Sequence, residues 1–490
     1  MQAVAPPFTK SFPPPRDKNT LAAYITEAAM LEQQFMCQYL YAAFSLKKQP
    51  DATCSPAQLE FVRRWASQVY MIARQEMEHL SIANSLLTAI GHAPWFGHDN
   101  FPTQSRWYTV EALEKKNIGL NAAPKPIDFP FLLQAFDLQV ARRFCCMESP
   151  TLNYVPPQDQ ANVTDWCYES DESDECGCVP KVEGPMPQSR TFVGGSAQSA
   201  NAVEPGTVQE LYAAIRTGLE YLNQALGPKA LFSGHQSGQS QIPSEYNIYL
   251  FSICDLDTAL AGIKLITSQG EGIDTPPGYD SHFQNYYDMS VEYAALLEDD
   301  PKFEPSLRLP LNPKLDQYTD LITSKAVKAF DEGYVAMLYM LSAYYGNYRS
   351  GEYDKPPYLF QALEQTVFAP TMTMLIRSLA ELITQLPGNA PGETAGPVFY
   401  LSPEVLKMLS QPSDPVFLDI NFHRANLEAV AYQLDQVINE PKLESALKPK
   451  FEYVHQNVLR MVANLSYIYE NGTFTKFVNL PNCPQDDGCE

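Results

Sequence analysis

The chain has 490 residues, of which 45% are hydrophobic, so it can bury a sizeable core. Lys and Arg total 34 against 57 Asp and Glu, and the resulting net charge of −23 disfavours nucleic acid and anionic membrane surfaces as partners. No uninterrupted apolar run reaches the ~18 residues that span a bilayer, and the first residues lack an apolar signal-like stretch. We therefore expect a cytoplasmic protein without membrane insertion.

Helical periodicity dominates the N-terminal part of the chain. Residues 1–17 hold five prolines and are expected to form an extended arm. Residues 151–205 are acidic and poor in aliphatic side chains, so we expect a weakly ordered insertion there. Apolar positions with helical spacing predict helices over 21–47, 57–90, 208–226 and 250–268, the last resuming over 282–297.

The rest of the chain also indicates an all-α protein. Residues 92–127 are rich in turn-forming residues and predict a loop, and 128–148 are apolar without a clear period. We find no sustained alternating strand pattern. Beyond residue 312, helical patterns predict helices over 315–345, 358–386, 403–410 and 423–470.

The ten cysteines are scattered, and in a reducing compartment most are expected to be free thiols. Cys145 and Cys146 are interpreted as core residues. Five histidines have no pattern of partners and are interpreted as surface or hydrogen-bonded histidines: His92, His98, His235, His423 and His455.

The second predicted helix carries a charged pair on its apolar face. The stripe from Val62 to Ile90 has the 3/4 spacing of one helix face, and it is apolar except at Glu76 and His79. A buried carboxylate is costly unless it is paired or binds a metal, and Glu-x-x-His facing a bundle core is the ligand pattern of carboxylate-bridged di-metal sites. The alternative is a buried ion pair without metal. Glu78 is offset from this face and is not expected to be a ligand.

The first predicted helix carries a matching carboxylate. Phe35, Met36, Tyr39 and Leu40 lie on one face, and Glu32 continues that face at helical spacing. Together with the Glu-x-x-His pair it would complete half of a di-metal site. The alternative is an ordinary buried or solvated glutamate.

The second half of such a site is less regular in the sequence. Glu210 flanks the apolar stripe of the third helix, and Glu271 follows the fourth helix at helical spacing. No Glu-x-x-His follows, and the nearest histidine is His282, eleven residues after Glu271 and past a turn-rich segment. For each of these residues a metal-ligand role and a solvated surface role remain alternatives.

Several segments resemble the ferritin-like domain of the iminophenyl-pyruvate dimer synthase family, which is found in bacterial enzymes that build violacein and rebeccamycin precursors. The resemblance covers roughly residues 18–405. Its segments are LEQQFMCQYLYAAFSLK (31–47), RQEMEHLSIANSLLTAIG (74–91), QELYAAIRTGL (209–219), KLITSQGEG (264–272), SHF (281–283), FDEGYVAML (330–338) and AGPVFYLSP (395–403).

The resemblance implies a ferritin-like four-helix bundle with additional C-terminal helices and long loops. On this basis we expect an arm (1–17), a metal-binding bundle (18–300) that carries the acidic insertion, a helical region packed on it (301–475) and a Cys-containing tail (476–490). Carried over by position, the resemblance places metal ligands at Glu32, Glu76, His79, Glu210, Glu271 and His282.

A site of carboxylates and imidazoles suits non-haem iron. The resemblance implies a non-haem iron oxidoreductase with two iron ions and O2 as co-substrate, acting on an amino-acid-derived small molecule by oxidation, desaturation or oxidative coupling. The alternatives are a non-catalytic metal-storage or scaffold protein and a zinc or manganese enzyme without redox chemistry. Whether the chain forms a homodimer is left open.

Overall fold

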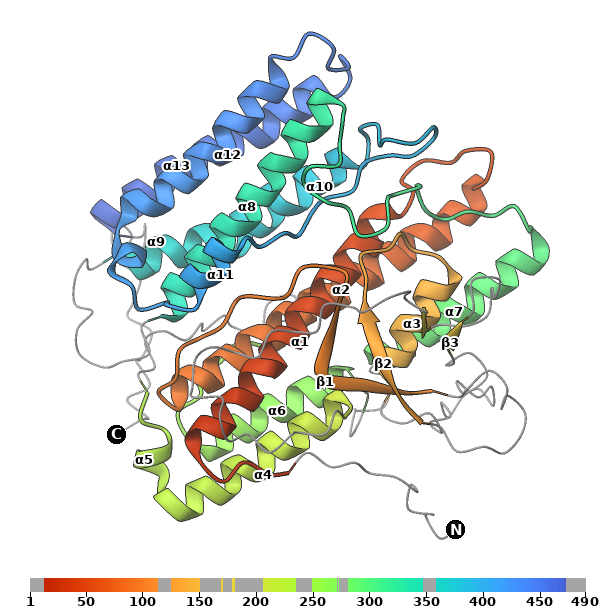
Figure 1. Cartoon of the computed structure of the whole chain (residues 1–490). Helices are drawn as coiled ribbons and strands as arrows, with labels where there is room; N and C mark the ends of the chain where they lie inside the picture. Colours follow the sequence, from red (N-terminus) through yellow and green to blue (C-terminus); the bar gives the residue numbers. More distant parts are fainter. Residues whose placement is uncertain are drawn as a thin grey trace, which may run out of the picture.

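The computed structural model describes residues 13–112, 125–149, 169–170, 179–180, 206–234, 249–270, 272, 281–346 and 358–472. Its helices form two groups, the N-terminal one across the bottom and right of Figure 1 and the C-terminal one in the upper left. The N-terminal group contains α1 (Lys18–Ser45), α2 (Pro56–Ala89), α3 (Leu138–Met147), α4 (Val208–Leu226), α5 (Pro228–Leu231), α6 (Leu256–Gly270) and α7 (His282–Asp299).

Local sequence signals fix the ends of these helices. Ser55 and Gln58 form a capping box around Pro56 at the start of α2, and Gly91 follows its end with φ 76°. Asp17 caps α1 through its side chain. The long helices α1 and α2 pack along each other, while α4 contacts α1, and α6 and α7 both contact α2. The predicted helices over 21–47, 57–90 and 208–226 are thus confirmed.

A strand pair between α2 and α3 corrects the prediction of a loop over 92–127. β1 (Thr103–Ala112) and β2 (Lys125–Phe131) are antiparallel, with Val110 opposite Ile127 and a register shift between Gln104 and Thr109. The shift, together with the two prolines in β2, interrupts the alternation by which a strand is recognised in a sequence. A second, two-residue pair, β3 (Glu169–Ser170) and β4 (Val179–Pro180), is parallel.

The strand pair helps to position the N-terminal bundle. The ring of Tyr108 stacks on that of Phe131 at 5.7 Å, and both rings lie within 6 Å of the Phe35 ring on α1. The Tyr108 hydroxyl also donates to the Met147 carbonyl oxygen at 3.2 Å, which ties β1 to the last residue of α3.

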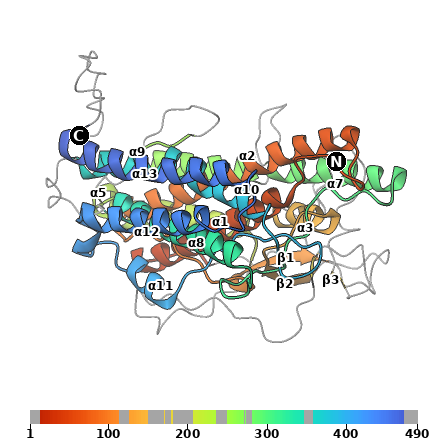
Figure 2. The same ribbon diagram turned by 90° about the horizontal axis from the view of Figure 1, so that it is seen from above.

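The C-terminal group is a second bundle. It contains α8 (Leu321–Tyr345), α9 (Leu359–Thr366), the π-helix η4 (Val367–Arg377), α10 (Ser378–Ile383), α11 (Pro403–Leu409), the 3₁₀-helix η5 (Pro415–Leu418), α12 (Ile420–Ile438) and α13 (Lys448–Asn471). In both views α12 and α13 run side by side (Figures 1 and 2). The single helix expected over 423–470 is therefore two helices, because Pro441 removes a backbone donor and ends the first.

The continuous segment from α9 to α10 has an irregular centre. Pro370 lies inside η4, where its missing N–H and its ring are accommodated by the wider π-type turns. Within the described residues, this segment (Leu359–Ile383) is long and apolar enough to cross a membrane by length and composition. It packs against α8 and α13, and a core helix of a soluble protein passes the same test.

Several expectations fall on residues that the structure does not describe: most of the N-terminal arm, nearly all of the 151–205 insertion and the C-terminal tail. Among the described cysteines, Cys37, Cys54, Cys145 and Cys254 form no disulfide, as expected. Cys146 is an exception because it is disulfide-bonded. Both Cys145 and Cys146 are buried, which confirms their interpretation as core residues.

Candidate metal centre

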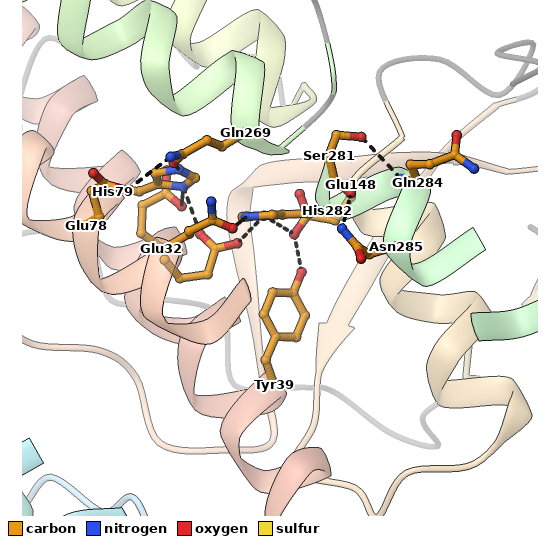
Figure 3. Close-up of polar contacts among 12 residues, drawn as sticks. Glu32, Tyr39, Glu78, His79, Glu148, Gln269, Ser281, His282, Gln284 and Asn285 are labelled. Atoms are coloured by element: carbon orange, nitrogen blue, oxygen red, sulfur yellow. Dashed lines mark hydrogen bonds and ion pairs between the residues drawn. The ribbon is translucent and has the colours of Figure 1, made fainter. Parts of the chain in front are cut away.

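Five carboxylate and imidazole side chains meet inside the N-terminal bundle. Glu32 comes from α1, Glu76 and His79 come from α2, Glu148 directly follows α3, and His282 is the first residue of α7. All five are buried. Figure 3 shows Glu32, His79, Glu148 and His282 converging from these separate elements. Charged side chains are rarely buried without a partner, so this cluster requires an explanation.

Glu76 is shared between two groups of potential ligands. Its Oε2 lies 3.1 Å from His79 Nδ1, and its Oε1 lies 2.9 Å from His282 Nδ1. Glu32 Oε2 completes the first group at 3.7 Å from His79 Nδ1, and Glu148 Oε1 completes the second at 3.5 Å from His282 Nδ1. In each group the three potential ligand atoms lie within 4.8 Å of one another. The two groups could each hold a cation, and Glu76 would be shared between them.

A tyrosine holds each of the two outer carboxylates. The Tyr212 hydroxyl from α4 donates to Glu32 Oε1 at 2.5 Å, and the Tyr39 hydroxyl from α1 donates to Glu148 Oε1 at 2.5 Å (Figure 3). Hydrogen bonds of this kind orient a carboxylate and restrict its rotation. The two halves of the cluster are therefore built alike at their carboxylates.

Glutamine side chains hold the outer nitrogens of the two histidines. His79 Nε2 lies 2.8 Å from Gln269 Oε1, and Gln269 Nε2 donates to Glu78 Oε2 at 3.2 Å. Glu78 also accepts from the Tyr249 backbone N–H. Because its amide nitrogen is committed to Glu78, Gln269 presents its oxygen to His79, so His79 Nε2 carries a proton and donates.

On the α7 side, His282 Nε2 lies 3.1 Å from Gln75 Oε1. This contact gives the same tautomer, with the Nε2 proton donated to an amide oxygen. Neutral His79 and His282 thus both direct an Nδ1 lone pair at carboxylate oxygens. An imidazole held by its distal N–H is the arrangement that orients histidine toward a metal.

The residues present fit a pair of metal cations. Lone pairs and carboxylate oxygens repel each other at these distances unless a cation or a proton lies between them. His282 Nδ1 is buried and makes no hydrogen bond of normal geometry to the described residues, although two carboxylates approach it closely. A metal ion bonded to Nδ1 and to those oxygens would satisfy it.

The electrostatics describe how the metal-free cluster balances its charge. Burial alone would raise the pKa of Glu76, but the facing charges of His282 and His79 outweigh burial and lower it. Burial raises the pKa of Glu32 to about 7 and also raises that of Glu148. Burial opposes the charged form of His282, yet Glu76 and Glu148 raise its pKa to about 9. Protons on the histidines therefore take the places that metal cations would take.

Four of the six residues expected as ligands are brought together: Glu32, Glu76, His79 and His282. Glu210 is not part of either group. It lies at the third position of α4, and its Oε2 accepts from the Thr207 backbone N–H at 3.0 Å to close a capping box. A capping glutamate also flanks the apolar stripe of its helix, so the stripe alone does not distinguish a cap from a ligand.

Glu271 lies outside the described residues, so its role as a ligand remains a prediction. The preceding residue, Gly270, does reach the cluster. A Cβ atom added at Gly270 would lie 3.3 Å from Glu148 Oε2, a tight contact. The end of α6 therefore packs directly against the Glu148 carboxylate.

Glu148 was missed because the segment over 128–148 was treated as having no clear period. The signal was present: Ala141, Phe144 and Cys145 are fully buried on one face of α3, and Glu148 continues that face at helical spacing. The same argument identified Glu32. The supporting residues Tyr39, Tyr212, Gln75 and Gln269 have no sequence pattern that separates them from ordinary core residues.

The chain is similar to two curated proteins. The chain is 24% identical over 439 residues to dichlorochromopyrrolate synthase of Lentzea aerocolonigenes, covering 81% of this chain and 37% of that protein. It is 25% identical over 422 residues to 2-imino-3-(indol-3-yl)propanoate dimerase of Chromobacterium violaceum, covering 79% and 35%. The chain thus spans just over a third of the length of these curated relatives.

A solved ferritin-like protein from Caulobacter vibrioides covers 72% of this chain and 94% of its own, with 15% identity and a TM-score of 0.41. The family model described as ferritin-like matches residues 25–291, which is more than half of the chain and includes all five clustered side chains. The chain belongs to the ferritin-like family.

Proposed function

We propose that this protein is a non-haem di-iron oxidoreductase that uses O2 to oxidise, desaturate or oxidatively couple an amino-acid-derived small molecule. The observation that carries the proposal is the shared carboxylate of Glu76, which faces a histidine on each side and creates two adjacent cation positions. A cluster of three carboxylates and two imidazoles suits iron.

Iron bound there would supply the electron transfer to O2 that the protein side chains cannot perform. The chain contributes ligand orientation and a dry environment. Tyr39 and Tyr212 restrain the outer carboxylates, and Gln269 and Gln75 fix the tautomers of the two histidines. Aromatic rings enclose the α7 side: Tyr39, Phe144 and Tyr286 contact one another with centroids 4.6 to 5.2 Å apart. They keep bulk water away from the reacting groups.

The substrate class is supported by the names of the relatives. One of them is named for the dimerisation of 2-imino-3-(indol-3-yl)propanoate, a 2-imino acid with an aromatic side chain. We extend this class, aromatic 2-imino and 2-keto acids, to the present chain. The same proposal assigns this chain to secondary-metabolite biosynthesis.

Metal analysis is the first test. Protein purified without added metal is compared by elemental analysis with a Glu76→Ala/His79→Ala double variant, a Glu148→Gln variant and a Glu60→Ala control. Glu60 is an exposed residue of α2. We expect close to two iron atoms per chain in the wild type and the control, none in the double variant and a reduced content in Glu148→Gln.

The iron-loaded protein is then assayed for O2 consumption. Its substrate is an imino acid that an amino acid oxidase produces from tryptophan in situ. Consumption beyond that of the oxidase alone, absent in the double variant, is the expected result. Zinc or manganese in place of iron would move the assignment to chemistry without electron transfer. Iron that is held and released without substrate-dependent O2 consumption would indicate storage or a scaffold.

A further inference from the structure

A third tyrosine at the cluster differs from the two that hold carboxylates. Tyr286 lies on α7 four residues after His282, so both side chains project from the same face of the helix. Its ring is fully buried and lies 5.2 Å from the rings of both Tyr39 and Phe144. The Tyr286 ring therefore packs on Tyr39, the tyrosine that holds Glu148, and the charges of Glu148 and Glu76 act on its hydroxyl.

The hydroxyl of Tyr286 has no hydrogen-bond partner among the described residues. Leaving a buried hydroxyl unpaired destabilises a fold, and most buried polar atoms in folded proteins are paired. Tyr39 and Tyr212, by contrast, each donate to a carboxylate. The described residues therefore leave the Tyr286 hydroxyl available to a further group in the site.

The surroundings of Tyr286 define the chemistry of that group. Burial, with the charges of Glu148 and Glu76, raises the pKa of Tyr286 well above its ordinary value, so the phenol keeps its proton and is a donor. A neighbouring metal cation would attract an anionic acceptor. Two polar atoms that make no hydrogen bond to the described residues, His282 Nδ1 and the Tyr286 hydroxyl, thus belong to one face of α7.

We propose that Tyr286 donates a hydrogen bond to a small anionic ligand that binds beside the metal position of His282 and Glu148, which makes this half of the site the reactive one. The inference rests on the proposed metal centre and adds the place where the exogenous ligand binds. The ligand has an oxygen acceptor, which either dioxygen-derived anions or the carboxylate of the substrate would provide.

The other half of the site is built differently. His79 is restrained by Gln269, which is itself held by the Glu78 carboxylate, and Tyr212 is already committed to Glu32. No described tyrosine hydroxyl without a hydrogen-bond partner adjoins Glu32 or His79. The His79 half is thus suited to holding its metal, while the His282 half retains a donor for a ligand.

The first experiment needs no metal. We compare the free energy of unfolding of the metal-free wild type, Tyr286→Phe and Tyr39→Phe by urea denaturation. Tyr286→Phe removes an unpaired hydroxyl and should be at least as stable as the wild type, whereas Tyr39→Phe removes the donor to Glu148 and should be less stable. A loss of stability in Tyr286→Phe equal to that in Tyr39→Phe would show that the hydroxyl has a structural partner and would overturn the inference.

The second experiment measures azide binding by absorption spectroscopy on cobalt(II)-loaded protein, with metal content determined on the same samples. Tyr286→Phe should keep its metal and bind azide about tenfold more weakly, as expected for the loss of a hydrogen bond to a charged group. Tyr293→Phe removes a phenol from the same helix eleven residues after His282 and should bind azide as the wild type does.

Equal azide affinity in Tyr286→Phe and wild type, with both loaded, would overturn the inference and leave the metal centre intact. A wild type that binds no metal would overturn both this inference and the proposed metal centre. Two measurements, the rate of iron oxidation by O2 and the KM for the substrate, then identify the natural ligand. A slower oxidation of iron by O2 without substrate in Tyr286→Phe would assign a dioxygen-derived anion, and a raised KM with an unchanged oxidation rate would assign the substrate carboxylate.

Discussion

The helix pairs α1–α2 and α12–α13 bury different kinds of side chain, although each pair packs along most of its length. The first pair buries five carboxylate or imidazole side chains: Glu27, Glu32, Glu76, Glu78 and His79. On α12 and α13 the described buried side chains are apolar except for His423 and Asn457, and neither is a carboxylate. The N-terminal pair therefore carries a desolvation cost that the C-terminal pair does not.

The difference separates the source of stability from the source of function. Apolar packing stabilises the C-terminal bundle through the area it removes from water. In the N-terminal bundle, part of the core is occupied by charged groups. Their burial adds little to the free energy of unfolding unless cations bind to them. The metal centre is thus expected to be a weak region of the metal-free protein, next to a bundle that needs no ligand to be stable.

The largest effect on stability is expected in the C-terminal bundle. Leu434 on α12 is fully buried, so Leu434→Ala leaves a cavity and should lower the free energy of unfolding by about 3–5 kcal/mol without changing the metal content. Glu76→Gln is nearly isosteric. It should abolish metal binding while lowering the free energy of unfolding by less than Leu434→Ala does. Urea unfolding and elemental analysis of both variants check the contrast. A loss of metal in Leu434→Ala would mean that the two bundles are energetically coupled.

The two bundles should also respond to pH in opposite directions when the protein is free of metal. The pKa of His282 is raised from 6.5 to about 9, so its contribution to stability is full below pH 6.5 and is lost as the pH rises through 9. Burial lowers the pKa of His423 in α12 from 6.5 to about 4, so its contribution is present above pH 6.5 and is lost as the pH falls toward 4.

We therefore expect the free energy of unfolding of the metal-free protein to fall by on the order of 2 kcal/mol between pH 6.5 and 9. His282→Gln should flatten this decline, because it removes one of the groups that titrate there. His423→Gln should leave the alkaline decline unchanged and flatten the part of the acid limb that His423 causes. Bound metal replaces the histidine protons, so metal affinity should instead increase with pH. An alkaline decline of the same size in His282→Gln would refute the assignment.

Sequence reasoning predicted the fold and part of the site, and each failure has a physical cause. Glu32, Glu76 and His79 were found because long regular helices make an apolar face easy to recognise, and a charge on that face stands out. Glu148 follows a ten-residue helix that comes after a bulged strand pair. So short a helix gives too few apolar positions for its periodicity to be recognised in the sequence. His282 required the resemblance, since a turn-rich segment separates it from α6.

Hydrogen-bond partners in the outer layer could not be predicted at all. Tyr39, Tyr212, Gln75 and Gln269 look like ordinary helix residues in the sequence, and their roles depend on which helices lie next to each other. Two prolines did mark irregular points in the sequence. Pro370 lies in the irregular η4, and Pro441 lies between α12 and α13. Helical periodicity alone does not predict such interruptions.

The smallest effect concerns Glu210, the expected ligand that the structure assigns to a helix cap. Its carboxylate accepts from the Thr207 backbone N–H, and Thr207 accepts in return from the Glu210 backbone N–H. Glu210→Ala should therefore lower the free energy of unfolding by about 0.3–1 kcal/mol through the loss of the cap and of a negative charge at the N-terminus of α4. Glu210→Gln, which can still close the capping box, should recover most of that loss. Both variants should keep the wild-type metal content, since the two groups around Glu76 need no sixth ligand from α4. Loss of one metal ion from both variants, with stability unchanged, would return Glu210 to the ligand set and would show that α4 moves toward the centre when metal binds.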